Sequence, residues 1–451
     1  MKSSLICHDN GDRRIGEDEA KCLPELQALS SKSISEIVAN RPSVLLFPLD
    51  LEKEDDQIGS QYIYSLAGTG DNGTSIITGN IVGFLGFKNV DLTIGSRFSP
   101  DAKKDYFLHY LLQKVFLGNV FDFSVSRDDE PIFDFLVYFF PQYLKRALAQ
   151  GLFRQYKRFS FNDPNVRGVV DIPRHIASNY PFTGRIAYST RVMSADNPLT
   201  QLVRHTIEHL KTTMLGNRLL QLDSETRDCV MEIVNCTPSY SKAARRQVLN
   251  DNLRPVNHPY YTAYQPLQRL CIAILRHESL STGQEDDEVK GILFDCAWLW
   301  EEYLATLLTP FMHHPQNRTE RDGIGVFTSG NYQWYPDFYK DGVAKPYVID
   351  AKYKHLDNDR WSREDLQQII SYIHLLMAEW GALAFPHCDD KQPGAQMCSL
   401  GQLNGLGGML YTLAFNIPKS EEDFSSFIEY SNFMKESEEA FVETVRNYAC
   451  L

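Results

Sequence analysis

The chain of 451 residues has 43% hydrophobic and 23% charged side chains, which is a globular composition, and its length predicts two or three domains. Its longest apolar run, Phe135–Phe140, is too short to span a membrane. Its nine cysteines include no C-x-x-C pair, so the sequence argues against a zinc site and against a disulfide framework. This use of cysteine favours a cytoplasmic location. The formal net charge of -13 argues against a protein that grips DNA over its whole surface, because contacts from Lys and Arg to phosphates dominate such binding.

Residues 43–98 have the pattern of β-structure. Four β-prone runs (VLLFPLDL, QYIYSLA, SIITGNIVGFLGF and VDLTIGS) are separated by Gly, Asn and Asp, so we predict an N-terminal β-rich domain over residues 1–102. The sequence GTGDNG at residues 68–73 formally matches G-x-G-x-x-G. A β-prone run follows it where a phosphate site would need the start of a helix, so we predict a hairpin tip there.

The middle of the chain, residues 103–288, is predicted to form a mostly helical domain. Strands and turns are expected within it from residue 151 to 198, where Asn-Pro and Asp-Pro pairs break the helical pattern. Asp196-Asn197 is expected to cap the helix that follows. The acidic segment 279–288 is the best candidate for a linker. Apolar residues at helical spacing predict helices over residues 104–117, 131–149, 198–214 and 266–278.

The basic residues of this middle region are concentrated in the stretch 150–219. Between Gln150 and Leu219 there are ten Lys or Arg and only four Asp or Glu. One interpretation is a solvated basic face. The other is a local contact surface for nucleic acid on an otherwise acidic protein, in which case a partner is expected to supply the rest of the DNA grip.

The order of predicted elements changes in the C-terminal third. A helix, three strands, a second helix and a further strand predict a mixed sheet flanked by helices over residues 289–451, so the whole chain is expected to be an α/β multidomain protein. The expected helices span residues 292–308 and 363–380, and the expected strands span 324–328, 332–339, 347–354 and 409–415.

One cluster of residues in this third has the chemistry of a metal-dependent nuclease. Lys340-Asp341-Gly342 predicts a turn that brings Asp337 beside Asp350-Ala351-Lys352, and the alternation of side chains along a strand puts Asp350 and Lys352 on one face. Two converging carboxylates suit Mg²⁺, which lowers the pKa of a bound water and polarises a phosphate. We therefore predict Asp337 and Asp350 as metal ligands, and Lys352 as the residue that orients or deprotonates the attacking water.

The D/E-x-K triplet is weak evidence by itself, because the chain contains at least four others. None of the four lies in a β-prone run that is preceded by a run ending in Pro-Asp, so the context selects Asp350-Ala351-Lys352. The alternative is an ordinary surface hairpin with an ion pair and no catalytic role.

Two residues on the flanking helices are further candidates for the same site. Glu301 lies among apolar residues of the preceding helix, where its carboxylate is able to complete the metal site; the alternative is an exposed helix acid. Gln368 and Tyr372 are four residues apart on the following helix and share a face. The amide of Gln368 is able to position Lys352 or the water, and the alternative is a glutamine at the edge of the core.

Segments along most of the chain resemble one known family. FDCAWLWEEYL, YPDF, VIDAKYK and REDLQQIISY follow one another in the order of that family's nuclease motifs, while RGVVDIPRHIASN and STRVMSADNPLTQLVRHTIEHL resemble its middle signature. On these segments the chain is similar to the McrC family, the nuclease subunits of modification-dependent McrBC restriction systems, and especially to its LlaJI-type relatives. Position 350 is Asp where many members of the wider nuclease superfamily have Glu, and both ligate Mg²⁺.

The resemblance implies a C-terminal PD-(D/E)xK restriction-endonuclease-like domain, with Glu301 at the family's acidic position. It also implies a partner, an oligomer of McrB-like AAA+ GTPase subunits, that binds GTP and recognises double-stranded DNA, with the N-terminal β-rich domain inserted into the partner's ring. The sequence itself has no G-x-x-x-x-G-K-[ST] motif, so GTP is expected to bind to another chain.

We therefore expect a Mg²⁺-dependent DNA endonuclease subunit of a GTP-dependent McrBC-like restriction system, which stimulates its partner's GTPase and has no membrane partner. Two alternatives stay open. One is a non-catalytic interaction subunit that activates the GTPase, and the other is a stand-alone defence or repair nuclease that cuts without nucleotide or partner.

Overall fold

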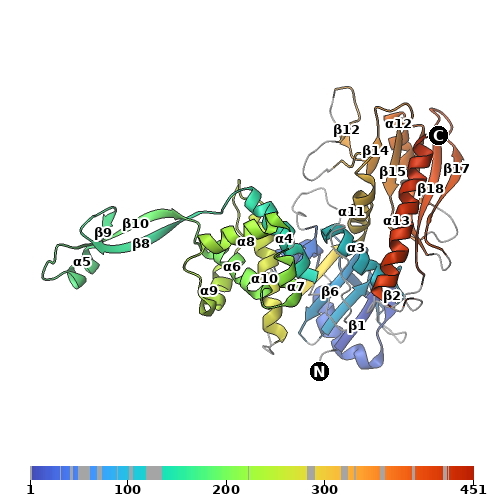
Figure 1. Cartoon of the computed structure of the whole chain (residues 1–451). Coiled ribbons are helices and arrows are strands. Elements are labelled where there is room, and N and C mark those ends of the chain that lie inside the picture. The colour runs from blue at the N-terminus through green and yellow to red at the C-terminus, as the bar shows by residue number, and fades with distance from the viewer. Residues whose placement is uncertain are drawn as a thin grey trace. The chain divides into compact units, whose positions relative to one another are not determined.

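The computed structural model divides the chain into two compact units (Figure 1), Met1–Ile132 with Asp286–Leu451, and Phe133–Glu285. This division differs from the three consecutive domains predicted over residues 1–102, 103–288 and 289–451, because the two ends of the chain share one unit. The structure describes residues 3–30, 32–40, 44–48, 61–68, 74–88, 90–100, 105–117, 135–221, 223–281, 290–315, 323–329, 332–355, 361–388, 392–419, 424 and 426–450.

The two ends of the chain are joined by a five-stranded sheet. Its order is β1 (Ser3–His8), β7 (Val90–Gly95), β6 (Ile81–Phe87), β11 (Lys290–Asp295) and β3 (Val44–Phe47). Strand β11 comes from the C-terminal part of the chain, yet it pairs antiparallel with β6 and parallel with β3. Its residues Ile292, Leu293 and Phe294 are fully buried, so the apolar run that was predicted to begin a helix at residue 292 instead completes the N-terminal sheet. Residues 1–102 are therefore not a separate domain.

The close approach of β6 and β11 depends on Gly83. This residue has φ of +135°, and a Cβ placed on it would lie 2.0 Å from the carbonyl oxygen of Ile292. We expect Gly83→Ala to lower the free energy of unfolding by roughly 2 to 5 kcal/mol, measured by urea denaturation, because it combines backbone strain with a steric clash. Gly401→Ala is the control, since Gly401 has φ of +128° but no atom within 4 Å of its Cβ position. Equal losses in the two variants would show that the close approach is unimportant.

The rest of the N-terminal part is built around this sheet. All four predicted β-prone runs contain strands, and the third run is divided into β5 (Ser75–Thr78) and β6 by a turn. Strand β5 lies between β2 (Asp12–Arg14) and β4 (Tyr64–Ala67) in a second, three-stranded sheet. The GTGDNG motif falls mostly outside the described residues, but a strand does follow it. Helices α1 (Leu23–Ser30), α2 (Ile34–Asn40) and α3 (Tyr106–Leu117) complete this part, and α3 agrees with the predicted helix.

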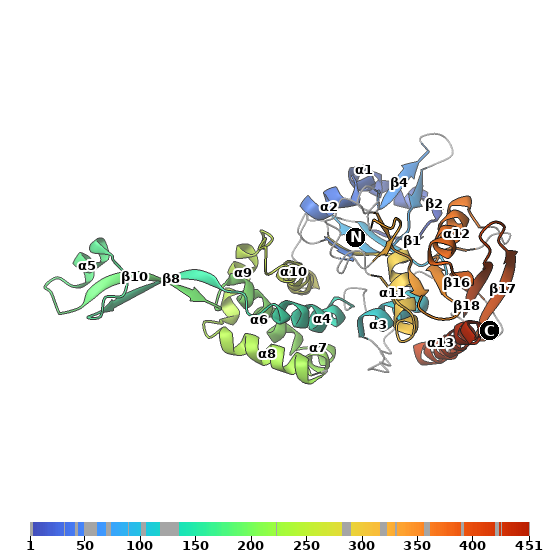
Figure 2. The same cartoon turned by 90° about the horizontal axis from the view of Figure 1, so that it is seen from above.

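A second five-stranded sheet carries the predicted site. Its order is β14 (Phe338–Lys340), β15 (Tyr347–Ala351), β16 (Trp380–Cys388), β18 (Met409–Ile417) and β17 (Ala395–Gln402). The three inner strands are parallel, and both edge strands are antiparallel to their neighbours. Helix α12 (Arg363–Leu376) covers one face, while α11 (Cys296–Leu308) and α13 (Phe427–Cys450) cover the other (Figure 2).

The predicted three-stranded meander and the predicted end of the helix that follows it are both wrong. Strands β12 (Ile324–Gly325) and β13 (Gln333–Trp334) pair only with each other, so only β14 and β15 belong to the main sheet. The helix predicted to reach Trp380 ends at Leu376, where Met377 adopts a left-handed conformation with φ of +48°. The next apolar run is the central strand β16. Such a run is buried on both faces and therefore lacks the alternation that identifies a strand in a sequence.

The second unit contains a helical bundle. Helices α4 (Phe135–Ala149), α6 (Pro198–Leu210), α8 (Ser224–Cys236) and α10 (Tyr264–Ser281) form its core, with α7 (Met214–Leu219) and α9 (Arg245–Asp251) beside them. Asn197 caps α6 as predicted, because its side chain accepts hydrogen bonds from the backbone N–H groups of Leu199 and Thr200. Most of the predicted linker 279–288 lies outside the described residues. In the described part of the chain no helix is both long and apolar enough to cross a lipid bilayer.

A β-arm, residues 155–194, projects from the helices of this unit (Figure 1). It consists of β8 (Gln155–Asp163) paired with β10 (Ile186–Ser194), the short strand β9 (Val169–Val170) and helix α5 (Ile172–Ser178). Six of the ten basic residues of the stretch 150–219 lie on this arm. Two of them make hydrogen bonds within the arm. Arg174 donates to the carbonyls of Phe161 and Tyr188, and Arg158 donates to Ser189. The remaining basic side chains leave both earlier interpretations of this stretch open.

Candidate active site

The hairpin of β14 and β15 brings the predicted acids together. Phe338 pairs with Ile349 in antiparallel register, so the neighbouring residues Asp337 and Asp350 lie opposite each other. Gly342 lies in the turn with φ of +67°. The Asp337 carboxylate accepts a hydrogen bond of 2.6 Å from the backbone N–H of Ala351. The predicted chain reversal is thus confirmed.

Asp350 on β15 and Lys352, one residue beyond its end, have their side chains on the same face, as the strand alternation predicted. Lys352 Nζ is 2.6 Å from Asp350 Oδ2, and the Asp350 side chain is fully buried while that of Lys352 is 13% exposed. The second carboxylate oxygen of Asp350, Oδ1, is buried and accepts no hydrogen bond from the described residues. A buried carboxylate oxygen without a donor is costly, which makes it a candidate ligand for a cation.

The charges of the site are unbalanced. Burial and the nearby charge of Glu301 raise the pKa of Asp337 to about 7. Burial and the charge of Asp337 likewise raise the pKa of Asp350 to about 7. Burial alone would lower the pKa of Lys352, but the charges of Asp350 and Asp337 raise it above the usual lysine value. One ammonium group therefore faces three acids, and an additional cation would stabilise their ionised forms.

Glu301 lies on α11 and reaches the site through its charge. The helix begins at Cys296, and the side chain of the preceding Asp295 caps it by accepting a hydrogen bond from Ala297 N–H. Glu301 is half-buried, and its charge is close enough to raise the pKa of Asp337. Glu302, by contrast, accepts a hydrogen bond from Trp298 on its own helix.

Gln368 connects Lys352 to α12. Its side-chain oxygen accepts a hydrogen bond of 2.9 Å from Lys352 Nζ, and its amide nitrogen donates to the Tyr372 hydroxyl over 3.2 Å. The Tyr372 hydroxyl in turn donates to the carbonyl of Tyr335, two residues before Asp337. The predicted shared face of Gln368 and Tyr372 is confirmed, and Gln368 contacts Lys352 directly.

The donor set fits a hard divalent cation. Among the described residues no three Asp, Glu, His or Cys side chains form a cluster that is able to hold a metal ion. Two carboxylates are nevertheless what Mg²⁺ commonly takes from a protein, since water and phosphate oxygens complete its octahedron. The unpartnered oxygen of Asp350 and the raised pKa values of both aspartates agree with such a ligand pair.

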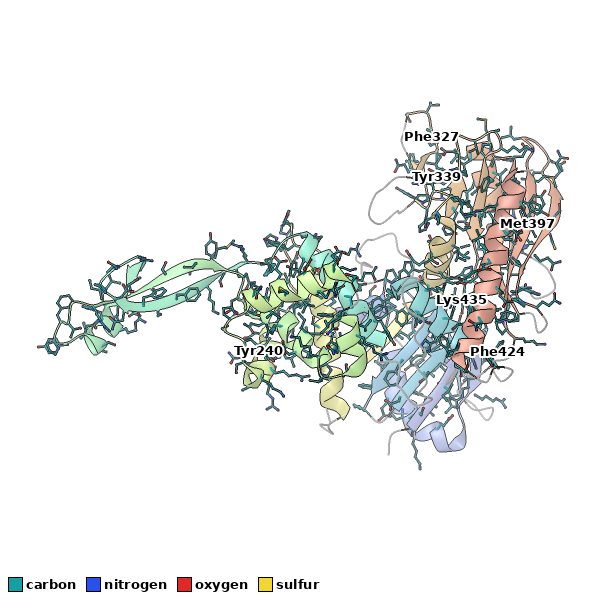
Figure 3. The ribbon with its side chains drawn as sticks, viewed as in Figure 1. Tyr240, Phe327, Tyr339, Met397, Phe424 and Lys435 are labelled. Atoms are coloured by element: carbon teal, nitrogen blue, oxygen red, sulfur yellow. The ribbon has the colours of Figure 1, made fainter. Side chains whose placement is uncertain are left out.

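Two supports of the site were not predicted from the sequence. His314 Nδ1 donates to the backbone carbonyl of Asp337 over 2.7 Å, and the adjacent His313 exchanges backbone hydrogen bonds with Tyr339, which is labelled in Figure 3. Asp365 on α12 accepts hydrogen bonds from Lys354, and its charge raises the pKa values of Asp350 and Lys352. Strand alternation offered a signal for Lys354, which is two residues after Lys352, but nothing local indicated His314.

Comparison with known proteins identifies the family. Residues 76–386 match the family model described as McrBC 5-methylcytosine restriction system component. The fold is similar to a chain in the refined half-complex of Thermococcus gammatolerans McrB AAA+ hexamers with bound McrC, with 14% identity, a TM-score of 0.48, and coverage of 99% of this chain and 100% of that one. A chain of the Thermococcus gammatolerans McrBC complex is similar with 15% identity, a TM-score of 0.33, and coverage of 68% of this chain and 87% of that one. No curated protein matches the sequence. Because the family model covers more than half of the chain, the protein belongs to the family of McrBC 5-methylcytosine restriction system components.

Proposed function

We propose that this chain is the DNA endonuclease subunit of a GTP-dependent McrBC-like restriction system, with a C-terminal domain of the PD-(D/E)xK type. The observation that carries the proposal is the convergence of the fully buried Asp350, the half-buried Asp337 and Lys352 in a chain of this family. The mixed sheet that holds them, with a helix before the hairpin and another after it, supports the same proposal.

The residues have distinct tasks in phosphodiester hydrolysis. Mg²⁺ bound to Asp337 and Asp350 would supply a water of lowered pKa and polarise the scissile phosphate. Asp337 is fixed for this task by the Ala351 N–H group. The charges of Asp350 and Asp337 raise the pKa of Lys352, which favours its protonated form, and this ammonium group would offset negative charge on the phosphate and orient the water. Glu301 adds negative charge beside Asp337, which strengthens attraction for a cation.

The partner in this proposal is an McrB-like AAA+ GTPase oligomer whose GTP hydrolysis the chain stimulates. The chain has no phosphate-binding loop motif, so GTP would bind to the partner. Its net charge of -13 also favours a partner that supplies most of the contacts to double-stranded DNA. The chain belongs to a family of restriction-system components, which agrees with this division of tasks between two proteins.

Cleavage by the purified chain with a candidate GTPase partner tests the proposal. Double-stranded DNA, with and without 5-methylcytosine, is incubated with both proteins, GTP and Mg²⁺. We expect cleavage that requires all four components and is lost in the Asp350→Ala variant. Stimulated GTP hydrolysis without any cleavage would instead support the non-catalytic subunit. Cleavage without GTP or partner would support the stand-alone nuclease, and cleavage by Asp350→Ala would refute the assigned site.

Gln368 provides a milder test of the same site. We expect Gln368→Ala to lower kcat by about 10- to 100-fold, because Lys352 loses the hydrogen bond that orients its ammonium group. Steady-state cleavage rates measure the effect. Gln367→Ala is the matched control, since Gln367 is an exposed neighbour on the same helix. If both variants cut at the wild-type rate, Gln368 is only a residue at the edge of the core.

A further inference from the structure

The segment that follows Lys352 is in contact with the segment that follows β7 of the N-terminal sheet. Ser96 Oγ and Tyr353 OH are 2.7 Å apart, and both side chains are almost fully buried, with Ser96 1% and Tyr353 6% exposed. The Tyr353 ring also packs edge-on against Phe98, with ring centroids 5.0 Å apart. Residues 96–98 and residue 353 are far apart in the sequence, so this contact exists only in the folded chain.

Arg97 strengthens this contact and is itself held rigidly. Its Nε donates to Asp9 Oδ2 over 2.7 Å, its backbone N–H donates to Asp9 Oδ1 over 2.5 Å, and Nη2 donates to Asp9 and to Asn80. The Asp9 side chain is fully buried, and that of Arg97 is 11% exposed. A guanidinium fixed by several hydrogen bonds to a buried carboxylate has little freedom to move.

The guanidinium and backbone of Arg97 contact both sides of the segment after Lys352. The guanidinium lies 4.9 Å from the centre of the Tyr353 ring, and Nη1 donates to the Tyr353 carbonyl over 3.5 Å. The His355 ring donates from Nε2 to the Arg97 carbonyl over 3.1 Å. We call this group of contacts, made by Asp9, Ser96 and Arg97 with Tyr353 and His355, the Arg97 clamp.

Lys352 needs such support because it lies one residue beyond the end of β15. Its N–H donates to the Ala384 carbonyl of β16 over 2.8 Å, so the sheet holds its backbone on one side only. On the other side of the strand, β14 begins at Phe338 and its last pair is with Ile349. The hydrogen bonds between β14 and β15 end before Lys352. The Arg97 clamp restrains the next residue, Tyr353, and so limits the movement of the Lys352 backbone.

We infer that Arg97, fixed by Asp9, is a positioning residue that holds Lys352 in place for the reaction, so that the N-terminal sheet forms part of the nuclease site. This inference rests on the proposed nuclease function. It assigns a role to Arg97, which lies 256 positions before Tyr353 in the sequence. Arg97 acts on Lys352 through Tyr353 and His355, the residues of this segment that it contacts.

Three variants of the full-length chain test the inference. Arg97→Gln removes the charge and the fork of donors, Arg97→Lys keeps the charge without the fork, and Tyr353→Phe removes only the hydroxyl that meets Ser96. We expect kcat to fall by about 10- to 100-fold for Arg97→Gln, less for Arg97→Lys, and about 3- to 10-fold for Tyr353→Phe, with KM for DNA within about twofold of wild type. Leu26→Ala, in the N-terminal core, is the control for a general loss of stability.

Hydrogen–deuterium exchange of peptides that span residues 347–355 gives a second readout, independent of cleavage. We expect the Lys352 and Tyr353 amides to exchange at least about tenfold faster in Arg97→Gln and measurably faster in Tyr353→Phe, but not in Leu26→Ala. Unchanged exchange in both clamp variants overturns the inference, as does faster exchange with an unaltered kcat. If the wild-type chain cuts no DNA, the proposed function fails, and the exchange data still decide whether Arg97 holds this segment.

Discussion

Replacing Asp350 with Asn is expected to lower kcat for DNA cleavage by about 1000-fold or more. The carboxylate is fully buried opposite Asp337, and one of its oxygens is free to bind a cation. Asn has nearly the same volume but supplies no negative charge, so the site loses an anionic ligand, and a loss of several kcal/mol in the stabilisation of the transition state is the usual consequence. Initial rates of cleavage with partner, GTP and Mg²⁺ measure the effect.

Asp341→Asn is the matched control for this variant. Asp341 is an exposed carboxylate in the turn of the same hairpin, so its replacement changes the net charge equally without touching the site. We expect Asp341→Asn to cut at the wild-type rate. Thermal unfolding of both variants shows whether the hairpin is intact. An Asp350→Asn variant that is folded and still active would contradict the assignment of the metal site.

The affinity for Mg²⁺ is expected to depend steeply on pH. In the absence of a cation, burial raises the pKa values of Asp337 and Asp350 to about 7, so protons compete with the metal below neutrality. If both carboxyl groups must ionise, affinity falls by up to about 100-fold for each pH unit below pH 7 and becomes constant above about pH 8. Isothermal titration calorimetry between pH 5.5 and 8.5 would measure this, with DNA absent.

The same pKa shifts predict how stability changes with pH. A carboxyl group whose pKa is higher in the folded state than in the unfolded state binds its proton more tightly when folded. Without divalent cations, the stability contributed by these two carboxyl groups should therefore fall as pH rises from the ordinary aspartate value of 3.8 to about 7. Mg²⁺ should raise the melting temperature most at the upper end of this range.

Asp337→Asn separates the contributions of the two acids. With one carboxyl group left, the affinity for Mg²⁺ should change by at most about tenfold for each pH unit. A wild-type affinity that is constant from pH 5.5 to 8.5 would show that neither carboxyl group titrates in this range, and it would contradict the crowding of charge at the site.

The core of the site could be predicted from the sequence because its determinants are local. Gly342 makes a turn between two short strands, and alternation along β15 places Asp350 and Lys352 on one face. Helical spacing also placed Gln368 and Tyr372 together on α12, where Gln368 contacts Lys352 and Tyr372 contacts Gln368. These relations extend over at most about thirty residues, so the geometry of a single strand or helix decides them.

The parts that were not predicted depend on contacts between distant segments. Strand β16 is apolar on both faces and has no alternation, while β11 joins strands that precede it by about two hundred residues. The Asp9–Arg97–Tyr353 contacts likewise join both ends of the chain. No local pattern in a single sequence specifies such pairings, because they are decided by which surfaces remain exposed when smaller elements have formed.

The position of β11 between β6 and β3 also affects how the protein is made. On the ribosome, residues 1–102 emerge first, but their sheet lacks its inner strand until residues 290–295 have been synthesised. During that interval β6 and β3 each present an unpaired, apolar edge, and such edges promote aggregation. We therefore expect the nascent chain to bind a chaperone until β11 has been synthesised. A fragment that ends before β11 should be insoluble.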